Sequence, residues 1–183
     1  EETPAKEAQA AYAEWILRER QLLNPGSCGQ GIYHLEFEAP DGVIAQWQSG
    51  ALAEILPRHA PDRVALFLSR TGLDGDVVIR HQNVACTLAD ALSRSVLPAG
   101  AEGLAPQAIA DSLQPLASRR YSVASVREDG RVHLLVRQAV HEDGFGLASG
   151  WLTAYATIGG RIDMRLLENS SFSLAPESGP AIF

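Results

Sequence analysis

The order in which strand-like and helix-like segments follow one another constrains the fold of this chain most. Strand-like segments fill the first and last thirds of the sequence, and helix-like segments lie between them. In residues 32–38, His34 and Glu36 alternate with Leu35 and Phe37, a period of two that is typical of a half-buried strand. No strand–helix–strand alternation of the kind that builds parallel sheets is present. The pattern therefore predicts a mainly β fold, a closed antiparallel barrel with a short inserted helical segment.

The individual elements are expected from periodicity and from turn residues. Predicted strands cover residues 15–23, 32–38, 50–56, 77–81, 121–126, 132–140 and 161–167, and predicted helices cover 63–71, 88–95, 104–116 and 149–158. Thr87 is the expected N-cap of the helix 88–95, because a threonine oxygen accepts a hydrogen bond from a free N–H group of the first turn.

The chain of 183 residues is long enough for one domain with a full core. Residues 1–14, rich in Ala and Glu, are expected to be a linker from an upstream segment, and residues 15–183 one domain with a helical insertion at about 87–116. The chain begins with Glu1 and ends in an apolar run at Phe183, so we expect both ends to be cut from a longer protein.

Charge and cysteine content argue against several classes of function. The net charge is −7, and no cluster of Lys and Arg interleaved with aromatic residues is present, so nucleic acid is not an expected partner. Cys28 and Cys86 form no CxxC motif and have no neighbouring pair of histidines, so neither a metal site nor a disulfide framework is expected. A reducing, cytoplasmic location follows as the expectation, since no apolar run approaches the roughly 20 residues that span a bilayer.

The first segment with chemical meaning is Arg119-Arg120-Tyr121-Ser122. Arg119 and Tyr121 are two residues apart, so on a strand their side chains point to the same side. The guanidinium can pair with a phosphate while the ring stacks on a flat ligand. The spacing by itself favours the alternative, a structural arginine at the rim of a barrel beside a half-buried tyrosine.

The second segment, residues 144–152, is a glycine-rich turn that leads into a helix. Free N–H groups at such a start attract anions, and Ser149 adds a hydroxyl. The alternative is a plain glycine-rich hairpin loop, and no βαβ unit surrounds the segment to support a Rossmann motif. Only one predicted strand, 132–140, separates it from the first segment, so we expect both to converge on one elongated ligand. In an acidic protein, Arg119 and this helix start would provide the positive potential that a pyrophosphate needs.

Several segments together resemble one known family. Residues 119–122 resemble the Arg-x-Tyr-Ser motif of ferredoxin–NADP reductases and diflavin reductases, and Gly146-Leu147-Ala148-Ser149 resembles their Gly-x-x-Ser/Thr motif. The segments 131–134, 33–36, 47–50, 87–92, 168–174 and 179–183 are also similar, so the resemblance covers about residues 15–183. The most similar family is that of the flavoprotein component of bacterial sulfite reductase, an NADPH-dependent diflavin reductase.

The resemblance implies that residues 15–183 are an FAD-binding barrel domain and that an NADP-binding domain follows after residue 183. It makes Arg119 the partner of the FAD pyrophosphate and Tyr121 the ring that stacks on the flavin. It places Ser122, as the catalytic residue, near the reactive nitrogen of the flavin. It also assigns the pyrimidine edge of the flavin to backbone groups of Leu135 and Arg137. The pyrophosphate is further assigned to Gly146, Leu147, Ala148 and Ser149, and His141 stands where relatives carry an aromatic residue that stacks on adenine.

The implied activity is that of an NADPH-dependent flavin oxidoreductase, in which electrons pass from NADPH through FAD to an acceptor protein or domain. A flavodoxin or membrane module in the parent chain fits this activity, and a membrane module would place the protein at the cytoplasmic face of the inner membrane. Two alternatives stay open. One is the reductase component of another ferredoxin–NADP-reductase-type system, and the other is a non-catalytic barrel that has lost its cofactor, since Ala51 and His141 depart from the family pattern.

Overall fold

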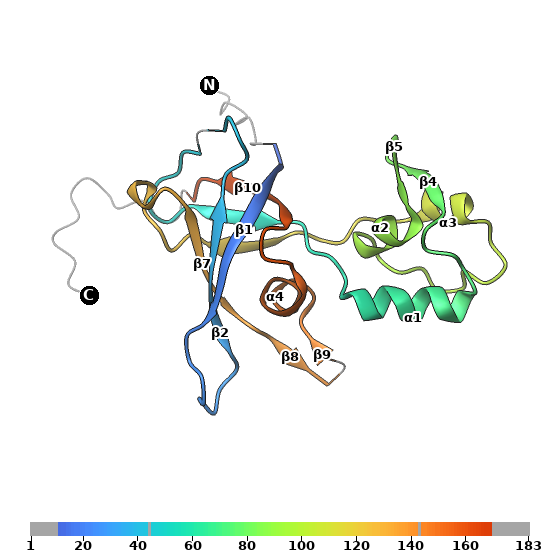
Figure 1. Cartoon of the computed structure of the whole chain (residues 1–183), viewed down its shortest axis with the longest axis horizontal. Coiled ribbons are helices and arrows are strands. Elements are labelled where there is room, and N and C mark those ends of the chain that lie inside the picture. The colour runs from blue at the N-terminus through green and yellow to red at the C-terminus, as the bar shows by residue number, and fades with distance from the viewer. Residues whose placement is uncertain (1–10, 44, 143, 170–183) are drawn as a thin grey trace, which may run out of the picture.

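A six-stranded antiparallel sheet forms the larger part of the molecule (Figure 1). The computed structural model describes residues 11–43, 45–142 and 144–169. The strands of the sheet follow the order β6-β3-β10-β1-β2-β7. Their bounds are Ala13–Leu22 for β1, Ile32–Glu38 for β2, Leu52–Ile55 for β3, Arg119–Ser122 for β6, Val132–Arg137 for β7 and Arg161–Leu167 for β10.

The alternation in β2 has the expected consequence. Leu35 and Phe37 are fully buried in the main core, whereas His34 and Glu36 lie on the opposite face of the sheet. Leu17, Leu134 and Ile162 enter the same core from β1, β7 and β10. Each such side chain contributes roughly 1.5–3 kcal/mol by leaving water, so the register of the sheet is fixed by its inner face.

The two end strands, β6 and β7, do not pair along their length. Within the described part of the chain they meet only at an isolated bridge between Val123 and Leu134, beside a hydrogen bond from the N–H of Ala124 to the carbonyl of His133 (2.8 Å). The prediction of a closed antiparallel barrel is therefore wrong. Strand β6 has only four residues, all paired with β3, and the chain turns away into the 3₁₀ turn Arg127–Asp129, so too little strand remains to close the sheet.

The mainly β class is also corrected. The described residues form ten strands, all in antiparallel pairings, together with four short helices, which makes the fold mixed. Much of the helical content lies in a lobe beside the sheet, between β3 and β6 (Figure 1). The lobe contains α1 (Pro61–Thr71), β4 (Val78–His81), β5 (Val84–Thr87), α2 (Leu88–Ser93) and α3 (Pro106–Ser112).

The lobe has a hydrophobic core of its own, formed around Leu88, Leu92 and Ile109. The predicted insertion at 87–116 covers only α2 and α3 of this lobe. The expected cap is present, because Oγ1 of Thr87 accepts a hydrogen bond from the N–H of Asp90 (3.1 Å). Strand β5 was not expected. It pairs with β4 across a two-residue turn in which Gln82 and Asn83 both have positive φ, as a tight hairpin requires.

A short hairpin and a helix connect β7 to β10. The hairpin consists of β8 (Val140–His141) and β9 (Gly144–Phe145), and helix α4 (Leu147–Gly150) runs on into the π-helical turn Trp151–Tyr155. The predicted helix 149–158 therefore begins two residues earlier. Of the predicted linker, residues 1–10 lie outside the described residues, as does the family-like run beyond residue 169. None of the described helices is long and apolar enough to cross a membrane.

Candidate functional site

Alternation along β6 gives its two arginines different surroundings. The exposed Arg119 donates hydrogen bonds from Nη1 to the carbonyls of Ala117 (3.2 Å) and Ser118 (3.0 Å). It forms no ion pair with any described carboxylate. Arg120 points to the other face and donates from Nε to the carboxylate of Glu54 (3.0 Å). Arg119 is thus the arginine of this motif that is available to an anionic ligand.

Glu54 is a buried carboxylate to which four side chains donate. Its side chain is only 4% exposed. The donors are the hydroxyl of Tyr12 (3.0 Å), the hydroxyl of Ser118 (3.1 Å) and the guanidinium groups of Arg120 and Arg165. Burial raises the pKa of Glu54, but the hydrogen bonds outweigh burial and hold this pKa at about 2. The carboxylate joins β3, β6 and β10, so Arg120 serves the fold rather than a ligand.

Tyr121 and Ser122 complete the motif at the free edge of β6. The ring of Tyr121 is half-buried and packs against the main core. Burial raises the pKa of Tyr121 to about 12, although the charge of Arg119 opposes this shift, so the phenol is neutral at ordinary pH. The side chain of Ser122 is exposed, and its hydroxyl makes no hydrogen bond with the described residues.

The backbone of β7 presents hydrogen-bonding groups toward β6. The carbonyl of His133 faces β6, where it accepts from Ala124, and the N–H of Gln138 donates to the loop that precedes β2. Backbone groups of successive residues point alternately to the two sides of a strand. Those of Leu135 and Arg137 therefore point to the side of β7 that faces β6, where the described residues form a single bridge, Val123–Leu134. The edge is also apolar, since Leu135 is 55% exposed.

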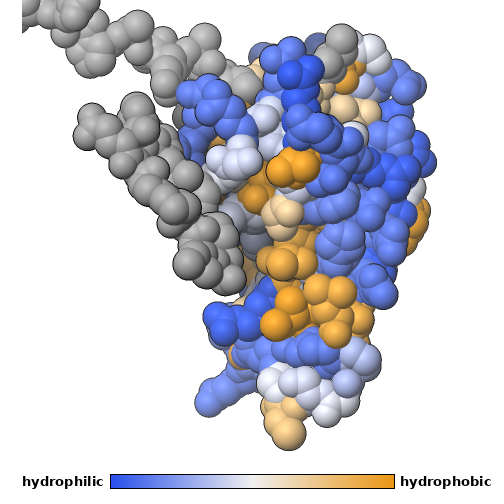
Figure 2. All heavy atoms as spheres, turned by 90° about the vertical axis from the view of Figure 1, so that its left-hand side faces the viewer, coloured by the Kyte–Doolittle hydropathy of each residue, from blue (hydrophilic) through white to orange (hydrophobic). Residues whose placement is uncertain are grey.

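Figure 2 looks at the face that lies on the left of Figure 1. Apolar side chains gather in the middle and lower part of this face, and polar side chains surround them. An exposed apolar area of this kind is often a place where a ligand or partner is buried.

The turn at Gly146 lies next to Ala139, which follows β7 by two residues. The hydroxyl of Ser149 accepts from the N–H of Ala139 (3.1 Å), and the N–H of Gly146 donates to the carbonyl of Ala139 (2.8 Å). A Cβ on Gly146 would lie 2.9 Å from Ser149 Oγ and 3.0 Å from Ala139 Cβ, so the turn has no room for a larger residue. The same Cβ would lie 3.5 Å from the ring of the exposed His141. Leu147 is half-buried and Ala148 is buried, so Ala148 reaches a ligand only through its backbone.

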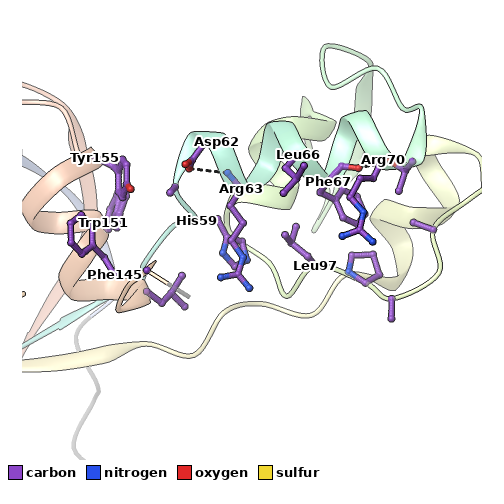
Figure 3. Close-up of a pocket in the computed structure, with 18 of the residues that line it drawn as sticks. His59, Asp62, Arg63, Leu66, Phe67, Arg70, Leu97, Phe145, Trp151 and Tyr155 are labelled. Carbon is purple, nitrogen blue, oxygen red and sulfur yellow. Dashed lines mark hydrogen bonds between the residues drawn. The ribbon is translucent and has the colours of Figure 1, made fainter. Parts of the chain in front are cut away.

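A cavity of about 800 Å³ lies between α1, the loop 97–102 and the segment 144–155. Figure 3 shows Arg63 and Arg70 pointing to the same side of α1, with Phe145, Trp151 and Tyr155 across the cavity. Neither arginine forms an ion pair with a described carboxylate. Gly146 and Leu147 line this cavity, but the other predicted site residues do not.

His59 adds an unpaired acceptor to the lining of the cavity. Its Nε2 lies 3.0 Å from the carbonyl of Ser95, so Nε2 carries the proton and Nδ1 is the acceptor. Nδ1 is buried and has no hydrogen-bond partner among the described residues. Burial lowers the pKa of His59, which keeps the ring neutral.

The structure thus places the predicted residues in two areas, the β6–β7 edge and the Gly146 turn. Sequence reasoning missed Arg63, Arg70 and His59. The first two had a detectable signal, because Arg63, Phe67 and Arg70 are spaced to share one face of a helix. No signal pointed to His59, whose contacts with Ser93 and Ser95 depend on the fold of the lobe.

No protein-family model matches this chain, and no curated protein matches it either.

Proposed function

We propose that this chain binds FAD and forms the flavin-binding part of an NADPH-dependent flavoprotein reductase similar to the sulfite reductase flavoprotein. In such a reductase, electrons pass from NADPH through FAD to an acceptor protein or domain. The proposal depends on one observation above all. The residues that the family resemblance assigns to the flavin ring lie on the facing edges of β6 and β7, which the described residues join by a single bridge, Val123–Leu134.

These facing edges suit a flat ring with a polar edge. Tyr121 offers a neutral, half-buried ring for stacking. The backbone groups of Leu135 and Arg137 on this edge that the bridge does not use can meet the donors and acceptors of a pyrimidine edge. The hydroxyl of Ser122 is exposed at the same edge and is available to the reacting part of the ring.

The rest of an elongated ligand would lie along the chain that follows β7. From Leu135 to Ala139 the chain extends by about 13 Å, and Ala139 is hydrogen-bonded to both Gly146 and Ser149. A pyrophosphate along this path would meet the free N–H groups near Leu147 and the charge of Arg119. Beyond Gly146 lies the cavity with Arg63, Arg70 and the unpaired Nδ1 of His59, whose volume is in the usual range for ligand pockets.

When bound, FAD would supply the redox chemistry, since a flavin accepts a hydride and releases electrons singly. The residues of this chain would bind, orient and shield it. Tyr121 would exclude water from one face of the ring, and the backbone of Leu135 and Arg137 would fix its orientation. Arg119 would offset the repulsion between a pyrophosphate and an acidic protein.

Exchanging the two adjacent arginines for alanine, one at a time, tests the proposal. Arg119→Ala should weaken FAD binding about ten- to a hundredfold, because it removes a charge-assisted contact. Arg120→Ala is the matched control, since its guanidinium is already held by Glu54. Isothermal titration and far-UV circular dichroism would report affinity and folding. Equal losses in the two variants, or a larger loss in Arg120→Ala, would contradict the assigned role of Arg119.

A further inference from the structure

Pairing of β2 with β7 brings three potential metal ligands together on the outer face of the sheet. Glu36 lies opposite His133 in the register, and His34, two residues before Glu36, lies diagonal to His133. One ligand atom from each of these residues lies within 4.8 Å of the others. All three side chains are partly exposed, so an ion from solution can reach them.

The two histidines are arranged with their ring nitrogens available. Their rings meet edge to face with centroids 4.9 Å apart. Nε2 of His133 lies 3.9 Å from Oε1 of Glu36, too far for a hydrogen bond. Within the described residues, neither ring donates or accepts a hydrogen bond, in contrast to His59 and His81, which both contact backbone carbonyls.

The carboxylate of Glu36 is oriented by a second group. Its Oε2 accepts from Nη1 of Arg131 (2.9 Å), which leaves Oε1 directed toward His133. Arg131 also lies 3.8 Å from Glu38, and Glu19 of β1 pairs with Glu36 in the register, so carboxylates outnumber cations around the cluster. Such a hydrogen bond to the distal oxygen is the usual support for a metal-binding carboxylate.

We propose that His34, Glu36 and His133 form a binding site for a divalent transition-metal ion, with Zn²⁺ as its reference ligand. Two imidazoles and a carboxylate suit Zn²⁺, Co²⁺, Ni²⁺ or Cu²⁺ and do not suit Mg²⁺ or Ca²⁺, which prefer oxygen ligands. In tetrahedral coordination, ligand atoms lie about 3.4 Å apart. The separations of up to 4.8 Å are close enough to this value for side-chain rotation to bring the ligand atoms around one ion. Three protein ligands leave the fourth position to water.

A metal at this position would join β2 to the end strand β7. That strand carries Leu135 and Arg137, and its other edge is held to β6 only by the isolated bridge. An ion that binds only the folded chain stabilises it in proportion to the logarithm of the ion concentration over Kd. The inference does not depend on FAD, because it concerns the outer face of the sheet.

Zinc binding to the tag-free protein, measured by competition with a chromophoric chelator, tests the proposal. The wild type should bind one equivalent, and His34→Ala and His133→Ala should each lose at least about tenfold in affinity. His81→Ala and Cys28→Ser are the controls, and both should bind as the wild type does. Thermal unfolding should show a zinc-dependent, EDTA-reversible rise in Tm that both ligand variants lack.

A second readout keeps the test independent of stability. Co²⁺ in a site with few ligands gives visible absorption bands, which should appear in the wild type and be absent from His34→Ala. His34 is on the solvent side of β2, so this variant should fold normally. Failure of the wild type to bind Zn²⁺ would overturn the proposal, and so would equal binding by the wild type and both histidine variants.

Discussion

Glu54→Gln is the substitution whose effect the structure specifies most fully. The carboxylate accepts hydrogen bonds from two arginines, a tyrosine and a serine, and it is almost completely buried. An amide at this position offers one oxygen, and its NH₂ group would face donors. The variant therefore loses charge-assisted hydrogen bonds and leaves two guanidinium groups without their shared partner.

The size of the effect follows from the pKa. A shift from 4.5 in the unfolded chain to about 2 in the folded chain corresponds to roughly 3 kcal/mol of stability. Because the folded pKa is depressed, this contribution is fully present above pH 4.5. It is lost as the pH falls from 4.5 to about 2. The glutamine variant lacks this contribution at every pH, so the difference between the two proteins should shrink over this interval.

Urea unfolding at pH 7, 5 and 3 measures the difference directly. Glu54→Gln should be roughly 3 kcal/mol less stable than the wild type at pH 7 and distinctly closer to it at pH 3. Glu14→Gln is the control, since Glu14 pairs with Arg161 on the exposed surface and should contribute at most about 1 kcal/mol. A difference between wild type and Glu54→Gln that stays constant from pH 7 to pH 3 would refute the assignment.

Two further predictions concern the proposed flavin site. The 183-residue chain loaded with FAD should be bleached quickly by dithionite but reduced only slowly by NADPH, because every described strand pairing is antiparallel and offers no βαβ nucleotide site. Stopped-flow rates for NADPH that equal those for dithionite would contradict this. Gly146→Ala should lower the free energy of unfolding in urea by roughly 1–3 kcal/mol and weaken FAD binding, because the new Cβ meets Ser149 and Ala139. The control Gly29→Ala has its nearest contact at 3.6 Å and should unfold within about 0.5 kcal/mol of the wild type. An unchanged Gly146→Ala protein would show that the turn is loosely packed.

Local pattern predicted the strands well where one face of the sheet is buried. The strands at 32–38 and 161–167 have the expected bounds, because their side chains alternate between core and solvent. Closure of the sheet could not be predicted in this way. Closure depends on how many residues of β6 pair with β7. Strand β6 ends at Ser122, and the chain enters the 3₁₀ turn Arg127–Asp129 before a longer pairing can form. Strand β5 was missed because its hairpin turn, Gln82-Asn83, contains no glycine.

The features of the candidate site likewise divide into those that local spacing predicted and those that depend on long-range contacts. Alternation alone predicted that Arg119 and Arg120 face opposite sides, but it could not identify Glu54, 66 residues away, as the partner of Arg120. The cavity beside Gly146 is lined by α1, the loop 97–102 and the segment 144–155, which are far apart in the sequence, and the histidine pair depends on the register of β2 with β7. Each of these contacts joins residues far apart in the sequence, so no local spacing indicates it.

Titration of the apoprotein with FAD and with FMN tests the central claim most directly. FMN carries one phosphate and no adenosine, so under the proposal it can occupy the β6–β7 edge but cannot reach the Gly146 turn and the cavity with Arg63 and Arg70. We predict one equivalent of FAD bound, at least about tenfold more tightly than FMN, since one further charge-assisted contact accounts for that ratio. Equal affinity for the two flavins, or no binding of FAD, would contradict the account.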